Sequence, residues 1–260
     1  MKDIKIIFFD IDGTLIDIEK KYITQTTLHT LRQLKERGIL LCIATGRGPA
    51  ILPKFENLEF DAFLTFNGSY CFCHRGDIFS NPIPAGDVRK IVQNAASIGR
   101  PVAVATKNLV LANGSEQDLV DYYAIANLEL KVAENFNEIL EEDIYQIMMG
   151  CRESEYSAIL KDVSGAKMAA WWDRAADIIP ATGGKGIGVE KILAYFGLNS
   201  SEAMAFGDGN NDIEMLQAVG TGVAMGNGSD RLKAVADAEC GPVSEEGIRE
   251  FCIAQGLISE

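Results

Sequence analysis

Apolar residues form short continuous runs in the first quarter of the chain. Residues 4–9 are apolar except for one lysine, a pattern typical of a strand buried on both faces of a sheet. A helix is expected over residues 26–37, where leucines recur every three positions and Gly38 follows. Two more strands are predicted over residues 39–44 and 62–66, with a short helix between them. Strands that alternate with helices predict right-handed crossovers and a parallel sheet.

The same alternation returns toward the end of the chain, so both ends can belong to one sheet. The predicted elements there are short strands and helices over residues 188–196 (helix), 203–206 (strand), 211–219 (helix), 222–225 (strand) and 230–236 (helix).

The middle of the chain has a different pattern, with paired strands that are joined by short turns. Its predicted strands cover residues 102–105, 109–112, 144–149 and 167–171, and its predicted helices cover residues 87–98, 116–126 and 154–161. Trp171 and Trp172 are placed on one of these strands, where alternation would point them to opposite faces. We therefore expect an α/β protein, with a Rossmann-like parallel-sheet core over residues 1–82 and 184–260. An α+β domain over residues 83–183, with an antiparallel sheet, interrupts this core.

The net charge of the chain limits the classes of molecule that it is expected to bind. The net charge is −13, from 37 acidic and 24 basic residues, and this balance repels nucleic acid and anionic membranes. The chain has no apolar run long enough for a membrane span and no secretory signal, so a cytoplasmic protein is expected. Cys71 and Cys73 fit the alternation of a strand better than a zinc site, because no second ligand pair follows them.

Polar residues follow the predicted parallel strands at the points where the strands end. Asp10-Ile11-Asp12-Gly13-Thr14 comes directly after the first strand, and Thr45-Gly46-Arg47 closes the second. Gly207-Asp208-Gly209-Asn210-Asn211-Asp212 ends a later strand, and Lys185 opens a helix. Ligands bind outside the carboxyl ends of strands in an open parallel sheet, so we expect these groups to meet there. Asp208 and Asp212 could instead cap the helix that follows them.

These four segments, in this order, resemble the motifs of the haloacid dehalogenase (HAD) superfamily. The inserted middle domain resembles the C2B cap of the Cof-type sugar-phosphatase branch, HAD-IIB. Further similarities to that branch lie at Thr45-Gly46-Arg47, Asn67-Gly68 and residues 222–227. The resemblance covers essentially the whole chain, and it implies a phosphatase that acts on a small phosphorylated metabolite such as a sugar phosphate.

The resemblance also implies a role for each residue. Asp10 is the expected nucleophile, which forms an aspartyl-phosphate intermediate, and Asp12 is the expected acid and base. Thr45 and Lys185 would contact the phosphoryl group, and Gly46, Arg47 and Asn211 are further candidate substrate contacts. Arg47 could equally be a surface residue in a loop.

Magnesium is the expected cofactor, because Mg²⁺ takes oxygen ligands and keeps several waters, so that two carboxylates suffice. The resemblance assigns these carboxylates to Asp10 and Asp208, with the backbone carbonyl of Asp12 as a third protein ligand. Asp212 would orient a metal-bound water or Lys185.

Two other functions remain open at this stage, and the expected assembly is a monomer or a small homo-oligomer. A phosphomutase of the same family would pass the phosphoryl group to a second hydroxyl. A regulator would bind a metabolite without catalysis, although the presence of Asp10, Asp12 and Asp208 disfavours it.

Overall fold

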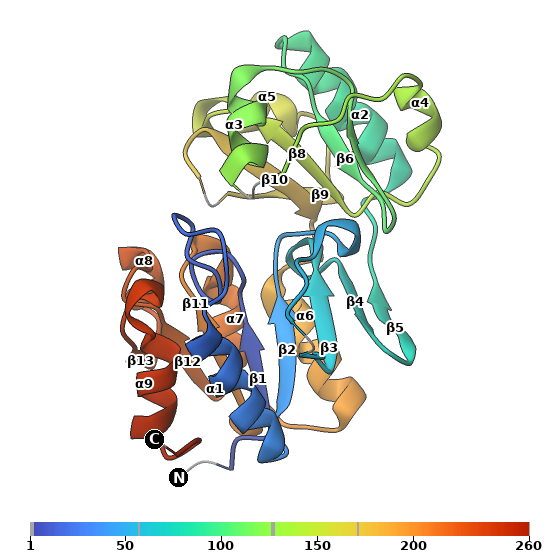
Figure 1. Cartoon of the computed structure of the whole chain (residues 1–260). Helices are drawn as coiled ribbons and strands as arrows, with labels where there is room; N and C mark the ends of the chain where they lie inside the picture. The colour runs from blue at the N-terminus through green and yellow to red at the C-terminus, as the bar shows by residue number, and fades with distance from the viewer. Residues whose placement is uncertain (1–2, 57, 126–127, 171, 260) are drawn as a thin grey trace. The chain divides into compact units, whose positions relative to one another are not determined.

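A computed structural model describes residues 3–56, 58–125, 128–170 and 172–259 (Figure 1). The chain forms two compact units, and each is described by itself. The core unit consists of Met1–Gly46, Pro53–Phe79 and Lys185–Glu260, and the inserted unit consists of Arg47–Leu52 and Ser80–Gly184.

The core unit is built on an eight-stranded sheet with the strand order β13-β12-β11-β1-β2-β3-β4-β5. Neighbouring strands from β13 to β3 are parallel, and β4 runs antiparallel to β3. The predicted parallel-sheet α/β fold is therefore confirmed. Its strands are β1 Ile6–Phe9, β2 Leu40–Ala44, β3 Ala62–Thr65, β4 Tyr70–Cys73, β5 Gly76–Ser80, β11 Ala203–Gly207, β12 Thr221–Ala224 and β13 Ala238–Glu239.

Helices cover both faces of this sheet (Figure 1). On one face, α6 and α7 pack against side chains of β1, β2, β3 and β11. On the other face, the stacked rings of Phe9 and Phe206 meet Phe251 of α9, which lies beside α1. The helices are α1 Gln25–Glu36, α6 Lys185–Phe196, α7 Ile213–Ala218, α8 Asp230–Lys233 and α9 Gly247–Ala254.

Local sequence explains the central elements of the core unit. All four residues of β1 are fully buried, as expected for a parallel strand that is covered on both faces. Thr24 caps α1, because its hydroxyl accepts a hydrogen bond from the backbone N–H of Thr27. Gly38 follows that helix with a φ of +81°, which is the left-handed conformation that favours glycine at this place.

The inserted unit contains a five-stranded antiparallel sheet with the order β7-β6-β8-β10-β9. Apolar side chains of α2 and α5 pack on one face of it. The strands are β6 Ala103–Ala105, β7 Val110–Ala112, β8 Gln146–Gly150, β9 Ala166–Ala169 and β10 Ala175–Pro180, and the helices are α2 Ala85–Ser97, α3 Gln117–Ile125, α4 Phe136–Ile139 and α5 Tyr156–Ile159.

Several sequence expectations need correction. The sequence pattern does not predict the strands β5, β10 and β13 or the helices α4 and α9. The helix expected before β3 is a single 3₁₀ turn, Pro49–Ile51. Trp172 was expected on a strand but lies in a bend after β9, with the guanidinium of Arg174 4.3 Å from the centre of its ring. Trp171 and Ala126, the expected ends of a strand and a helix, lie outside the described residues.

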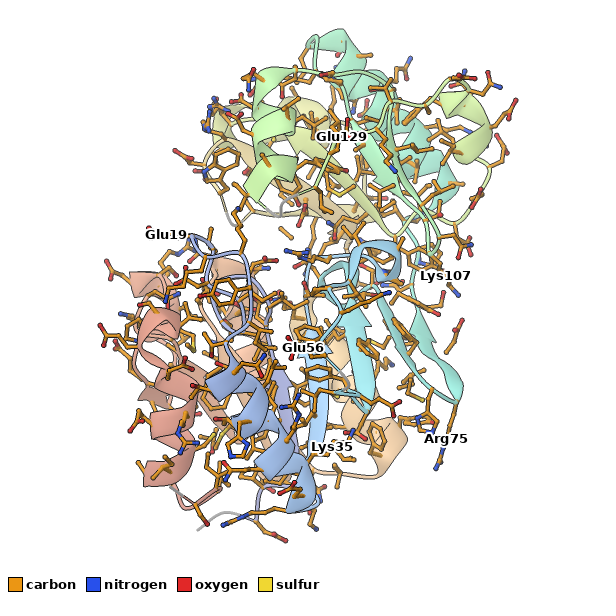
Figure 2. All side chains as sticks on the ribbon, in the orientation of Figure 1. Glu19, Lys35, Glu56, Arg75, Lys107 and Glu129 are labelled. Atoms are coloured by element: carbon orange, nitrogen blue, oxygen red, sulfur yellow. The ribbon has the colours of Figure 1, made fainter. Side chains whose placement is uncertain are left out.

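Charged side chains hold some loops of the core unit in place. Lys35, near the end of α1, donates a hydrogen bond to the carbonyl of Glu59 in the loop before β3 (Figure 2). Within the described part of the chain, helices are too short or too polar to cross a membrane.

Candidate active site

The candidate site lies at the carboxyl edge of the core sheet, where neighbouring parallel strands end. Asp10 follows β1 and Asp208 follows β11, and these two strands are paired. The chain leaves β1 toward β2 on one side, while β11 and β12 lie on the other side. Such a reversal of strand order is where open α/β sheets bind ligands. The packing of the sheet therefore brings together two carboxylates that are far apart in the sequence.

Lys185, the first residue of α6, joins two of the carboxylates. Its ammonium donates hydrogen bonds to Asp10 Oδ1 at 2.6 Å and to Asp212 Oδ1 at 2.5 Å. The side chain of Lys185 is fully buried. Burial alone would lower the pKa of Lys185, but the charges of Asp10 and Asp212 outweigh it and raise that pKa above its ordinary value. Lys185 is therefore a fixed cation at this edge.

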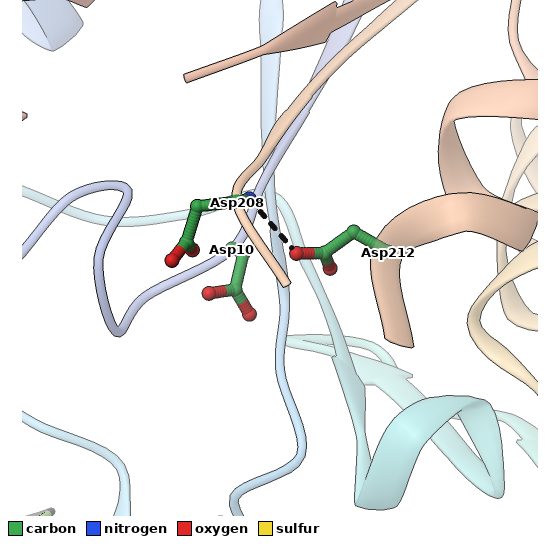
Figure 3. A group of neighbouring side chains, drawn as sticks. All are labelled: Asp10, Asp208 and Asp212. Atoms are coloured by element: carbon green, nitrogen blue, oxygen red, sulfur yellow. Dashed lines mark hydrogen bonds between the residues drawn. The ribbon is translucent and has the colours of Figure 1, made fainter. Parts of the chain in front are cut away.

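Asp212 also organises the backbone around it. Its Oδ2 accepts a hydrogen bond from the backbone N–H of Asp208 at 3.1 Å (Figure 3). The same oxygen accepts a second hydrogen bond from the backbone N–H of Gly209 at 2.9 Å. Both oxygens of this fully buried carboxylate are thus engaged, one by Lys185 and one by the loop. This arrangement favours a positioning role for Asp212 over direct contact with a ligand.

The carboxylates of Asp10, which is buried, and Asp208, which is half-buried, are crowded together. Burial raises the pKa of Asp10 from 3.8 to about 7, with Lys185 opposing the shift and the charges of Asp212 and Asp12 adding to it. Burial, followed by the charges of Asp10 and Asp212, raises the pKa of Asp208 well above its ordinary value. Carboxylates in such a place are stabilised by a cation.

The oxygens of these carboxylates could hold a metal ion. One oxygen each of Asp10, Asp208 and Asp212 lie within 4.8 Å of one another (Figure 3). Carboxylate oxygens are the donors that Mg²⁺ prefers, whereas zinc sites use mainly nitrogen and sulfur. The donor set therefore fits magnesium.

The loop after β1 is shaped around Asp208. Thr14 donates its hydroxyl hydrogen to Asp208 Oδ1 at 3.0 Å, and the side-chain amide of Asn227 donates to the carbonyl of Gly13 at 2.8 Å. Thr14 and Asn227 both lie in segments that resemble the family, but neither was assigned a role of its own from the sequence. Thr14 could have been given a role from its position in the segment that carries Asp10, whereas the segment over residues 222–227 did not indicate which of its side chains reaches the loop after β1.

Gly13→Ala is expected to destabilise the protein more than Gly38→Ala. Both glycines have positive φ values, +87° and +81°, so each alanine costs about 1–2 kcal/mol for its backbone alone. A Cβ on Gly13 would also lie 2.2 Å from Asp208 Oδ2, whereas nothing lies within 4 Å of a Cβ on Gly38. Urea unfolding of both variants measures the difference, and equal losses would contradict the close approach of Gly13 to Asp208.

The remaining predicted site residues are distributed as follows. Thr45 is buried directly after β2, and Asp12 is half-buried in the loop after β1. Asn211 donates its side-chain N–H to Asn67 Oδ1 at 3.0 Å, and Gly46 lies against the side chain of Asn67. Arg47 is half-buried and belongs to the inserted unit, so its contact with substrate stays a prediction.

Comparison with known proteins gives matches along nearly the whole chain. Residues 7–252 match the family model of haloacid dehalogenase-like hydrolases. YkrA of Bacillus subtilis is 32% identical over 98% of this chain and 99% of its own. YitU of the same bacterium, a 5-amino-6-(5-phospho-D-ribitylamino)uracil phosphatase, is 30% identical over 95% of each chain. The solved structure of the HAD subclass IIB sugar phosphatase BT4131 has a TM-score of 0.89 at 30% identity, covering 98% of this chain and 100% of that one.

Proposed function

This chain belongs to the haloacid dehalogenase-like hydrolases, in their Cof-type subclass IIB, and is a phosphoric monoester hydrolase; we propose that it releases phosphate from sugar phosphates with the help of Mg²⁺. The observation that carries the proposal is the buried ammonium of Lys185 between Asp10 and Asp212, beside Asp208. A phosphate monoester is a dianion, so a nucleophilic carboxylate approaches it only where cations offset the repulsion.

In the proposed reaction, Asp10 is the nucleophile and Asp12 is the general acid and base. An oxygen of Asp10 forms a bond to phosphorus while the bond from phosphorus to the ester oxygen breaks, and Asp12 gives that ester oxygen a proton. Asp12 then takes a proton from the water that attacks phosphorus, which releases phosphate and restores the carboxylate of Asp10. The half-buried position of Asp12 is compatible with proton exchange with a leaving alcohol and a water.

The other residues of the site bind the phosphoryl group or hold the catalytic side chains in place. Lys185 holds Asp10 in place and offsets charge on the phosphoryl group, and Asp212 fixes Lys185 through its hydrogen bond. Thr45 and Asn211 donate hydrogen bonds to phosphoryl oxygens. Asp10, Asp208 and the backbone carbonyl of Asp12 would hold Mg²⁺, which supplies positive charge to the transferring group when it is bound.

The substrate class is proposed from the relatives. BT4131 is a sugar phosphatase, and the YitU substrate carries its phosphate on a ribityl chain. The proposed substrates are therefore phosphorylated sugars and sugar alcohols. The inserted unit, as the expected cap, would select among them.

The test is phosphate release from a panel of hexose phosphates, pentose phosphates and a phosphorylated sugar alcohol, measured with Mg²⁺ and with EDTA. We expect release from several of them with Mg²⁺ and none with EDTA. Interconversion of phosphosugar isomers without release would instead identify a phosphomutase. Release that is equal in EDTA would contradict the role of magnesium.

Magnesium is also expected to stabilise the folded protein. A ligand at about 100 times its Kd raises the free energy of unfolding by about 2.7 kcal/mol. Asp208→Asn removes a proposed ligand, so most of this gain should disappear in that variant. Asp3→Asn is the control, because the side chain of Asp3 is 85% exposed. Thermal unfolding with and without Mg²⁺ measures the gain, and an undiminished shift in Asp208→Asn would count against this site.

A further inference from the structure

The turn after β3 has an unusual backbone. Phe66, Asn67 and Gly68 follow one another with φ values of 51°, 52° and 91°, and all three residues are buried. Glycine adopts this left-handed conformation easily, asparagine less easily and phenylalanine at a considerable cost. Such a conformation persists where the surroundings impose it, and it is frequent at functional sites.

Asn67 connects this turn to two segments of the proposed site. Its backbone N–H donates to the carbonyl of Thr45 at 3.0 Å, which fixes the end of β2. Its side chain lies against Gly46, since a Cβ on Gly46 would be 3.1 Å from Asn67 Nδ2. Its Oδ1 accepts a hydrogen bond from Asn211 Nδ2 at 3.0 Å. Asn67 itself is 2% exposed, and its bond with the half-buried Asn211 is partly buried.

The same turn also touches the helix that carries Lys185. A Cβ on Gly188, in the first turn of α6, would lie 3.1 Å from the Cα of Gly68. The turn after β3 is therefore in contact with three of the segments that carry the proposed site: the one after β2, the one after β11 and the start of α6.

We propose that Asn67 is a positioning residue for the phosphoryl group, and that it acts through Asn211. A side-chain amide is planar and carries two N–H hydrogens. When Asn67 Oδ1 accepts one of them, the plane of the Asn211 amide is fixed, and with it the direction of the second N–H. That second N–H donates to a phosphoryl oxygen. This inference rests on the proposed function and gives a role to a residue to which the sequence analysis assigned none.

A purely conformational role would not require this side chain. At a φ of 52°, glycine would adopt the backbone with less cost than asparagine. Asn67→Gly therefore keeps the turn and removes only the amide. Asn67→Asp keeps the left-handed preference together with an oxygen that can accept the bond from Asn211.

The test compares the effect of Asn211→Ala in three backgrounds: the wild type, Asn67→Gly and Asn67→Asp. The readouts are kcat/KM and the inhibition constant of inorganic phosphate, which does not depend on the fraction of active enzyme. Asn67→Gly should lower kcat/KM and weaken phosphate inhibition, each by about tenfold, since one hydrogen bond to a charged group is lost. Adding Asn211→Ala should then change little, whereas it should cost a similar factor in the wild type and in Asn67→Asp.

Two results would overturn the proposal. One is an equal effect of Asn211→Ala in all three backgrounds, which would mean that the residues act independently. The other is an unchanged inhibition constant in Asn67→Gly. Asp162→Gly is the control for glycine at a left-handed position, because Asp162 has a φ of 59° and its side chain is 69% exposed. It should leave both readouts unchanged.

Failure of the proposed function can be told apart from failure of this inference. If the wild type releases no phosphate from any compound, the proposed function fails. The shift in melting temperature caused by inorganic phosphate with Mg²⁺ then replaces the kinetic readouts in the same variants. A shift that is reduced in Asn67→Gly and not reduced further by Asn211→Ala would support the inference. The absence of this pattern would overturn it.

Discussion

Lys185→Met should lower kcat by about 10³-fold and the free energy of unfolding by about 3–5 kcal/mol. Methionine keeps the length and the apolar contacts of the lysine stem but removes the charge. The carboxylates of Asp10 and Asp212 would remain buried and within reach of each other without the ammonium between them. The positive charge that the proposed mechanism places beside the phosphoryl group would also be lost.

The matched control is Lys191→Met, on the same helix. Lys191 is exposed, and its ammonium lies 5.2 Å from the centre of the Phe79 ring rather than beside a carboxylate. We expect nearly unchanged activity and a change in unfolding free energy within about 0.5 kcal/mol. Steady-state kinetics measures kcat of both variants, and urea unfolding measures their free energies of unfolding. A Lys185→Met enzyme with kcat near that of the wild type would remove Lys185 from the mechanism.

The sequence allowed the parallel sheet to be predicted because its signals are local. A strand such as β1, buried on both faces, is a continuous apolar run, and Gly38 ends the following helix by its own backbone preference. The strand β10 was missed for a physical reason. Asp177 lies in its middle and is 1% exposed, although aspartate is rare in strands. Its carboxylate accepts a hydrogen bond from the hydroxyl of Tyr122 at 2.6 Å. The local sequence around Asp177 does not predict this partner, which is 55 positions away.

The place of the candidate site could be predicted from the sequence, but some of its side-chain contacts could not. The rule that parallel strands end at one edge was enough to bring Asp10 and Asp208 into one place, and Lys185 was expected there from its position at the start of a helix. The family resemblance left open whether Asp212 orients a metal-bound water or Lys185. The hydrogen bonds of Lys185 to both Asp10 and Asp212 depend on how α6 packs on the sheet. The bond between Asn67 and Asn211 joins residues 144 positions apart, and it arises only from the folded chain.

Asp10→Asn should lower kcat by at least about 10⁴-fold. In EDTA, the stability of this variant relative to the wild type should increase as the pH rises. The amide is nearly isosteric but cannot serve as the nucleophile. Burial holds the pKa of Asp10 at about 7, above its ordinary 3.8, so the folded state binds a proton that the unfolded state has already released. The stability of the wild type relative to Asp10→Asn should therefore fall between about pH 4 and pH 7 and then level off.

Asp17→Asn provides a control with the opposite sign. The backbone N–H of Glu19 and the neighbouring Lys20 hold the pKa of Asp17 below its ordinary value, although burial opposes them. The wild type should therefore be more stable than Asp17→Asn above the ordinary carboxyl pKa, and it should lose this advantage as the pH falls. Urea unfolding of the three proteins in EDTA from about pH 2 to pH 8 measures both differences, because the advantage from Asp17 is lost only below its ordinary pKa of 3.8. Identical pH dependence of the wild type and Asp10→Asn would mean that Asp10 is ionised in the folded protein as readily as in water, and that the crowding of carboxylates around Lys185 carries no energetic cost.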